Sequence, residues 1–114
     1  MRTIAELSSD PVVGRFVQDK LSLIAQEFAP THLILFGSRA TGQARTDSDI
    51  DLIVVSDRFR DVRYPNRMGD FLIKVQPDVH VDAICYTPEE FAEALQAQSS
   101  FVRDAMANGV DIQH

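Results

Sequence analysis

The chain has 114 residues, of which 45% are hydrophobic and 25% charged, as expected for one globular domain over residues 1–114. No apolar run approaches the roughly 20 residues of a membrane-spanning helix, and the first residues lack the apolar segment of a secretory signal. Seventeen acidic against 11 basic residues give a net charge of −6, which disfavours binding along a nucleic-acid backbone. We therefore expect a cytoplasmic domain that binds neither membranes nor nucleic acid directly.

The first part of the chain predicts one long helix. Asp10 can accept hydrogen bonds from free N–H groups at a helix start, and Pro11 suits the first helical position. Apolar residues then recur at spacings of three and four as far as Phe28, and Pro30 ends the pattern. One face of this helix should be buried.

Two short apolar segments, Leu33–Phe36 and Ile50–Val55, predict central strands of a sheet. The connection between them is too long for a tight hairpin and predicts a glycine-containing loop with one helical turn from Ser38 to Thr41. Residues 56–67 form a polar loop that leads into a helix whose apolar positions are Met68, Phe71, Leu72 and Val75.

The remaining elements alternate between strand and helix. Residues 79–86 alternate in polarity as a strand does, with the single cysteine, Cys85, among the buried positions. Thr87, Pro88 and Glu90 form a capping box that opens a helix towards Gln98. A last helix follows over residues 101–106, and residues 110–112 could pair as an edge strand. Three or more strands in one sheet, covered by helices, predict an α+β fold.

A Gly37-Ser38 turn after the first strand could bind a triphosphate, because a glycine lets phosphate approach free backbone N–H groups. The spacing from Gly37 to Gly42 is that of a Walker A loop. However, Gln43 and Ala44 stand where that loop requires a lysine and a hydroxyl residue. The alternative interpretation of this turn is an ordinary loop.

Asp49 and Asp51 are two residues apart on a strand, so their side chains should share one face, with Cα atoms roughly 6.5 to 7 Å apart. They could simply be a solvated strand end. Asp82, however, also lies in an apolar strand, and three carboxylates at one sheet edge would suit Mg²⁺. Two ions about 3.5 to 4 Å apart could then bind donor phosphates and activate an acceptor hydroxyl, whose proton Asp82 could take.

Residues 36–55, FGSRATGQARTDSDIDLIVV, resemble the signature of the DNA polymerase beta-like nucleotidyltransferase superfamily. The match rests on Gly37, Ser38, Ala40, Gly42, Ser48, Asp49, Asp51 and Leu52, with Asp82 as the third carboxylate. The short chain is most similar to the minimal nucleotidyltransferases of the antitoxin type. This resemblance implies a nucleotidyltransferase fold, a small mixed β-sheet flanked by helices.

The resemblance also implies site residues. Asp49, Asp51 and Asp82 would be the catalytic and metal-binding residues, holding two Mg²⁺ ions. Gly37, Ser38, Arg39 and Ser48 would contact the nucleotide, although the Arg39 side chain could either pair with a phosphate or be solvated.

The implied reaction transfers a nucleoside monophosphate, expected to be AMP from ATP, to a hydroxyl group. The implied partner is a toxin with a HEPN domain, whose tyrosine would be the acceptor, so that the chain would act as an antitoxin. Two alternatives remain open: an antitoxin that acts by binding alone through a vestigial site, and a small-molecule nucleotidyltransferase of the antibiotic-modifying kind that needs a partner subunit.

Overall fold

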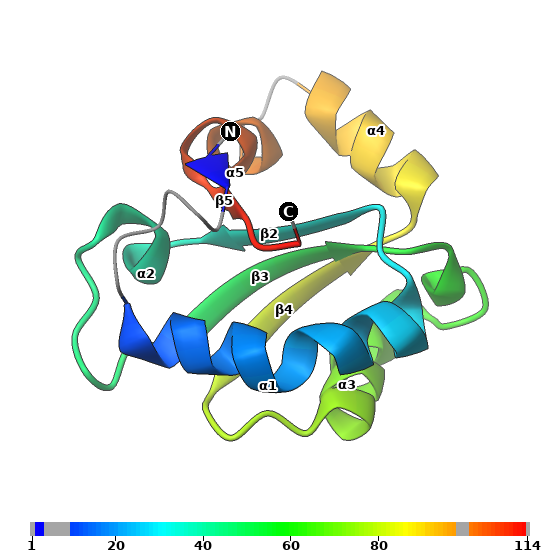
Figure 1. Cartoon of the computed structure of the whole chain (residues 1–114). Helices are drawn as coiled ribbons and strands as arrows, with labels where there is room; N and C mark the ends of the chain where they lie inside the picture. The colour runs from blue at the N-terminus through cyan, green and yellow to red at the C-terminus, as the bar shows by residue number, and fades with distance from the viewer. Residues whose placement is uncertain (1, 4–9, 98–100, 114) are drawn as a thin grey trace.

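The computed structural model of the chain describes residues 2–3, 10–97 and 101–113. Its centre is a five-stranded sheet in the order β1-β5-β2-β3-β4, with helices on both faces (Figure 1). The strands are β1 (Arg2–Thr3), β2 (His32–Phe36), β3 (Ile50–Val55), β4 (Val81–Tyr86) and β5 (Val110–Asp111). The helices are α1 (Pro11–Phe28), α2 (Ser38–Thr41), α3 (Tyr64–Val75), α4 (Pro88–Gln96) and α5 (Phe101–Asn108).

The sheet is mixed, as the α+β prediction requires. β2 runs antiparallel to β3 and to β5, whereas β3 runs parallel to β4 and β1 parallel to β5. The connection from β3 to β4 passes through α3, which is the crossover that a parallel pair needs. The two strands predicted to be central, β2 and β3, do lie inside the sheet.

Helix α1 has the bounds and the cap that the sequence predicts. The Asp10 side chain accepts from the backbone N–H groups of Val12 and Val13, at 3.0 and 3.2 Å. The helix ends at Ala29, which takes the left-handed conformation (φ 42°) before Pro30. The side chains of α1 that are buried against the sheet are Val13, Phe16, Ile24 and Phe28.

Each face of the sheet buries a separate apolar cluster. On one face, α1 and α3 bring Phe28 and Phe71 together with ring centroids 5.3 Å apart. On the other face, α4 and α5 pack Phe91 and Val102 against Ile53. Strands covered on both faces need apolar residues at nearly every position, which accounts for the apolar runs of residues 33–36 in β2 and 52–55 in β3.

The C-terminal strand is not at the edge of the sheet, so that part of the prediction is wrong. β5 lies between β1 and β2, and the edge strand on the far side is β4. A Cβ on Gly109 would collide with the carbonyl oxygen of Ala105 and lie 2.8 Å from that of Leu35. The missing side chain therefore allows the chain to turn from α5 directly into pairing with β2.

Other boundaries moved by a few residues. α3 begins at Tyr64, inside the segment predicted to be a loop, and a 3-10 turn over Asp57–Phe59 precedes it. β4 begins at Val81 rather than at residue 79, but its alternating burial is as predicted. The capping box of α4 is present, whereas the predicted helix end at Gln98 lies outside the described residues. Among the described helices, none is long and apolar enough to cross a membrane.

Candidate functional site

The Gly37-Ser38 turn lies directly against the Asp51 carboxylate. β2 ends at Phe36, which pairs with Asp51 of β3, and Gly37 then takes a positive φ of 77° before α2 begins. A Cβ on Gly37 would collide with the Oδ2 atom of Asp51. Glycine is therefore required here both by conformation and by space. The predicted phosphate-binding turn and the Asp51 carboxylate are in direct contact.

The three predicted aspartates gather at one end of β3 and β4. Asp51 pairs with Asp82 in the parallel ladder, so the two side chains emerge on the same face from adjacent strands. Asp49 immediately precedes β3, because the strand begins at Ile50. The backbone N–H of Ile50 donates to the carbonyl of His80 at 2.9 Å, which aligns the starts of the two strands.

The three carboxylates influence one another electrostatically. Partial burial raises the pKa of Asp51 above its ordinary value of 3.8, and the negative charges of Asp82 and Asp49 raise it further, in that order. Asp49 and Asp82 are exposed and Asp51 is half-buried. The site therefore concentrates negative charge that only a cation or a proton can relieve.

The donor set suits a hard divalent cation, since all three side chains offer carboxylate oxygen. The side chains are not arranged around an ion, however. Within residues 2–3, 10–97 and 101–113, no group of three or more His, Cys, Asp or Glu side chains is placed so that it could hold a metal. The residues fit Mg²⁺ by chemistry and by charge, and binding would require the carboxylates to draw together.

The Arg39 side chain has a different position from either of the two predicted. It is only 4% exposed, so it is not solvated. Its Nη1 atom donates to both carboxylate oxygens of Asp10, at 3.1 and 3.0 Å. Its remaining nitrogens donate to the backbone carbonyls of Arg45, Thr46 and Ser48. The guanidinium is thus used within the protein, where it holds the loop between α2 and β3.

Ser48 also organises that loop. Its hydroxyl oxygen accepts from the backbone N–H of Arg45 at 2.8 Å, and its carbonyl accepts from Arg39. The Ser38 carbonyl accepts from the N–H of Gln43 at 3.0 Å, which closes the turn around α2. The nucleotide contacts assigned to Gly37, Ser38 and Ser48 stay predictions.

A hollow of about 360 Å³ adjoins the Gly37-Ser38 turn, between α2 and α5. From α5, it is lined by Phe101, Asp104, Ala105, Asn108 and the following Gly109. None of these was predicted as a site residue, because the pattern of α5 indicates only which side chains face the core. Gly37 thus borders both the Asp51 carboxylate and this hollow.

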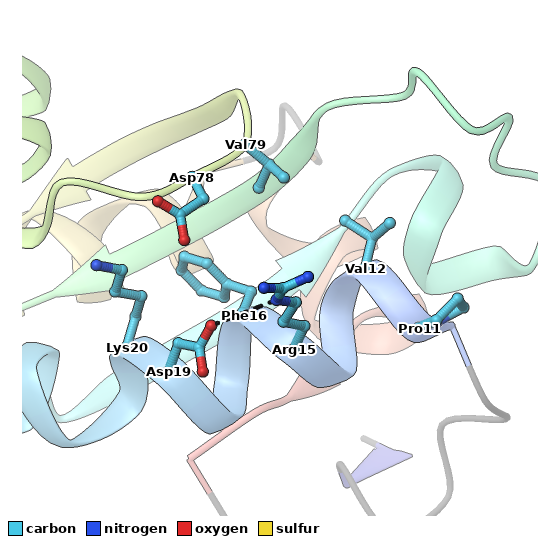
Figure 2. A pocket seen from close by; sticks show the side chains of 8 residues that line it. All are labelled: Pro11, Val12, Arg15, Phe16, Asp19, Lys20, Asp78 and Val79. Atoms are coloured by element: carbon cyan, nitrogen blue, oxygen red, sulfur yellow. Dashed lines mark ion pairs between the residues drawn. The ribbon is translucent and has the colours of Figure 1, made fainter.

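A second hollow, of about 330 Å³, lies between α1 and the segment that leads into β4 (Figure 2). The Phe16 ring lies between Lys20 and Arg15, with Asp78 facing them. Arg15 pairs with Asp19 at 3.7 Å. None of the predicted site residues lines this hollow, so it is separate from the candidate site.

A family model for nucleotidyltransferase domains matches residues 18–112. The chain belongs to this family. The match spans the Gly37-Ser38 turn and all three aspartates, so the predicted superfamily is confirmed and nucleotidyl transfer is the activity class of this nucleotidyltransferase domain. The finer assignment to the antitoxin type is not part of that match.

Solved structures include a similar chain, a candidate nucleotidyltransferase from Sulfolobus solfataricus. It is 22% identical, with a TM-score of 0.45, over 76% of this nucleotidyltransferase domain and 84% of that chain. A search of curated proteins gave no match.

Proposed function

We propose that this nucleotidyltransferase domain transfers AMP from ATP to a tyrosine hydroxyl of a partner toxin with a HEPN domain, with release of pyrophosphate, and so acts as the antitoxin of the pair. The observation that carries the transfer chemistry is the position of Asp51. It lies against Gly37, opposite Asp82, and two residues after Asp49. A turn that can bind phosphate and three oxygen-donating side chains therefore share one place.

Each residue has a role in this proposal. Asp49, Asp51 and Asp82 would hold Mg²⁺, which when bound would neutralise phosphate charge and lower the pKa of the acceptor hydroxyl. Gly37 and Ser38 would bind the triphosphate through their backbone. Asp82 is exposed and is the one of the three aspartates that lies on the edge strand β4. It could accept the proton of the incoming hydroxyl.

A protein acceptor is supported by the openness of the site and by the charge of the chain. Asp82 lies on the edge strand β4, where a partner could reach it. The net charge of −6 would attract a partner with a basic surface and would speed their association.

The test is a transfer assay with the protein, the product of the neighbouring gene, labelled ATP and Mg²⁺. We expect label on a tyrosine of the partner and none when Asp49 and Asp51 are both replaced by asparagine. Absence of transfer with every nucleoside triphosphate would contradict the enzymatic proposal.

A second candidate is an antitoxin that neutralises its partner by binding alone. It is favoured by one observation: the described side chains form no ready metal-binding group. In that case the Asp49→Asn, Asp51→Asn variant would still neutralise the toxin in growing cells. Under the enzymatic proposal the same variant would bind the toxin without protecting the cells.

A further inference from the structure

The Arg39 guanidinium binds the loop between α2 and β3. This loop carries Asp49, one of the three predicted metal-binding residues. Its Nε and Nη2 atoms donate to the Ser48 carbonyl at 3.0 and 2.8 Å. That carbonyl belongs to the peptide bond that joins Ser48 to Asp49. Arg39 therefore fixes the peptide group immediately before the Asp49 Cα.

Asp49 is held from its other side as well. The next backbone N–H, that of Ile50, donates to the His80 carbonyl as the first bond of the ladder with β4. Asp49 is therefore flanked by two hydrogen-bonded backbone groups, the Ser48 carbonyl and the Ile50 N–H, while its own side chain is exposed. The loss of the Arg39 bonds would leave Asp49 as the end of a loop that is anchored on one side.

Asp10 completes this arrangement. It is 14% exposed and binds Arg39 through both oxygens, while the same Oδ1 atom caps α1. A buried guanidinium needs such a partner, because an unpaired charge in this environment is costly. Through Asp10, the start of α1 is connected to the loop that carries Asp49.

We propose that Arg39, oriented by Asp10, is a positioning residue that fixes the backbone of Asp49 within the divalent-cation site. The inference rests on the metal site of the proposed function. In this inference Arg39, the arginine of the Gly-Ser-Arg-Ala sequence, binds the loop that carries Asp49 and does not contact the nucleotide. Side chains that orient metal-binding residues in this way typically change metal affinity roughly 10- to 100-fold when they are removed.

The chain offers a matched control in Arg67, which is 6% exposed. It too binds backbone carbonyls, those of Val62 and Cys85, and one carboxylate, that of Glu90 at 2.6 Å. It lies on α3, towards the other end of β4 from Asp82. Replacing either arginine by methionine removes one positive charge and one buried network, but only Arg39 is attached to the loop of Asp49.

The experiment measures Mn²⁺ binding by electron paramagnetic resonance on the whole chain, at a temperature where circular dichroism shows each variant folded. Both Arg39→Met and Arg67→Met should lower the melting temperature. Arg39→Met should also weaken Mn²⁺ binding by about tenfold or more, whereas Arg67→Met should leave it unchanged. Equal effects of the two substitutions on Mn²⁺ binding would overturn the inference.

A milder pair covers the case in which Arg39→Met does not fold. Asp10→Asn keeps an effective helix cap but removes the charge that orients Arg39, and Glu90→Gln does the same to Arg67. We expect Asp10→Asn to weaken Mn²⁺ binding and Glu90→Gln to leave it as in the wild type. If Asp10→Asn binds Mn²⁺ as the wild type does, the role of Asp10 is overturned.

The same titration separates this inference from the proposed function. If the wild-type chain binds no Mn²⁺, both the metal site and the inference fall. If it binds Mn²⁺ and Arg39→Met weakens the binding, the inference stands even where no AMP transfer is found.

Discussion

Asp51 has an environment that disfavours its charged form, because its carboxyl is partly buried beside two others. Its raised pKa means that the folded state binds a proton more tightly than the unfolded state does. Stability should therefore fall as pH rises from 3.8 through the raised pKa of Asp51. The Asp51 charge is thus a cost that is present at neutral pH and absent in acid.

Asp51→Asn tests this directly. The variant should be more stable than the wild type at pH 7 and should lose that advantage as pH falls towards 3.8, where the wild-type carboxyl takes up its proton. Urea unfolding at a series of pH values measures the difference. Parallel curves for the two proteins would show that neither burial nor the neighbouring carboxylates raise the pKa of Asp51.

Gly37→Ala should disrupt the site, and Gly42→Ala is its control. Both glycines have a positive φ, 77° and 79°, but their ψ angles differ. Gly42 (ψ 14°) lies in the left-handed region, where an alanine costs about 1 kcal/mol, whereas Gly37 (ψ −157°) lies in a region that is open almost to glycine alone, so its substitution is more strained. Only at Gly37 would the new Cβ strike Asp51, since nothing lies within 4 Å at Gly42. We expect Gly37→Ala to be the more destabilising in urea unfolding and to abolish Mg²⁺-nucleotide binding by calorimetry. Equal losses would mean that neither the backbone conformation of Gly37 nor its contact with Asp51 matters.

Much of the candidate site could be predicted from single residues. Asp51 and Asp82 stand out because charge in an apolar strand needs a reason, and the parallel register does pair them. The position of Arg39 could not be predicted. Its carboxylate partner lies 29 residues earlier and its carbonyl partners depend on the path of the loop, neither of which leaves a local pattern.

At the scale of elements, helix α4 depends on a shared contact at its first turn. The Glu90 carboxylate accepts from the Thr87 N–H at 2.7 Å and from Arg67, which is anchored on α3. The hydrogen bond from Arg67 is the main cause that lowers the pKa of Glu90 below 4.5. This carboxylate therefore stabilises the fold above that pH, and the stabilisation is lost as pH falls through the lowered pKa.

Glu90→Gln should consequently show the opposite pH dependence to Asp51→Asn. The variant should be less stable than the wild type at pH 7, and the difference should shrink as pH falls below 4.5. The same urea unfolding series measures both. A difference that does not vary with pH would assign the effect to packing rather than to the Arg67 pair.

Elements with strong local signals were predicted well. Of the two made by distant pairing, β1 was not predicted, and β5 was predicted as a strand but at the wrong place in the sheet. Asp10 and Pro11 define the start of α1, and the Thr87-Glu90 capping box defines that of α4. β1 and β5 are two residues each, too short for any alternation. They form because β5 pairs with β2 and β1 pairs with β5. This pairing is a property of the folded sheet.

At the scale of the whole molecule, ligand binding should stabilise the domain strongly, because the cation would cancel the repulsion of three carboxylates. Binding at a hundredfold excess over Kd contributes about 2.7 kcal/mol, which in a domain of this size raises the melting temperature by on the order of 10 °C. Scanning calorimetry with Mg²⁺ and ATP together measures it.

The controls are ATP without Mg²⁺ and the Asp49→Asn, Asp51→Asn variant, neither of which should gain stability to that extent. An unchanged melting temperature of the wild type at millimolar Mg²⁺ and ATP would remove the physical support for the metal site.

The single cysteine of the chain, Cys85, has a practical consequence. It is 3% exposed on β4, and burial raises its pKa to about 12, so the folded protein presents almost no thiolate. In the unfolded chain the same thiol regains ordinary reactivity. The rate at which an alkylating reagent consumes it therefore reports how often the α3 side of the edge strand opens. Cys85 is thus a native probe of local opening, and no engineered label is needed.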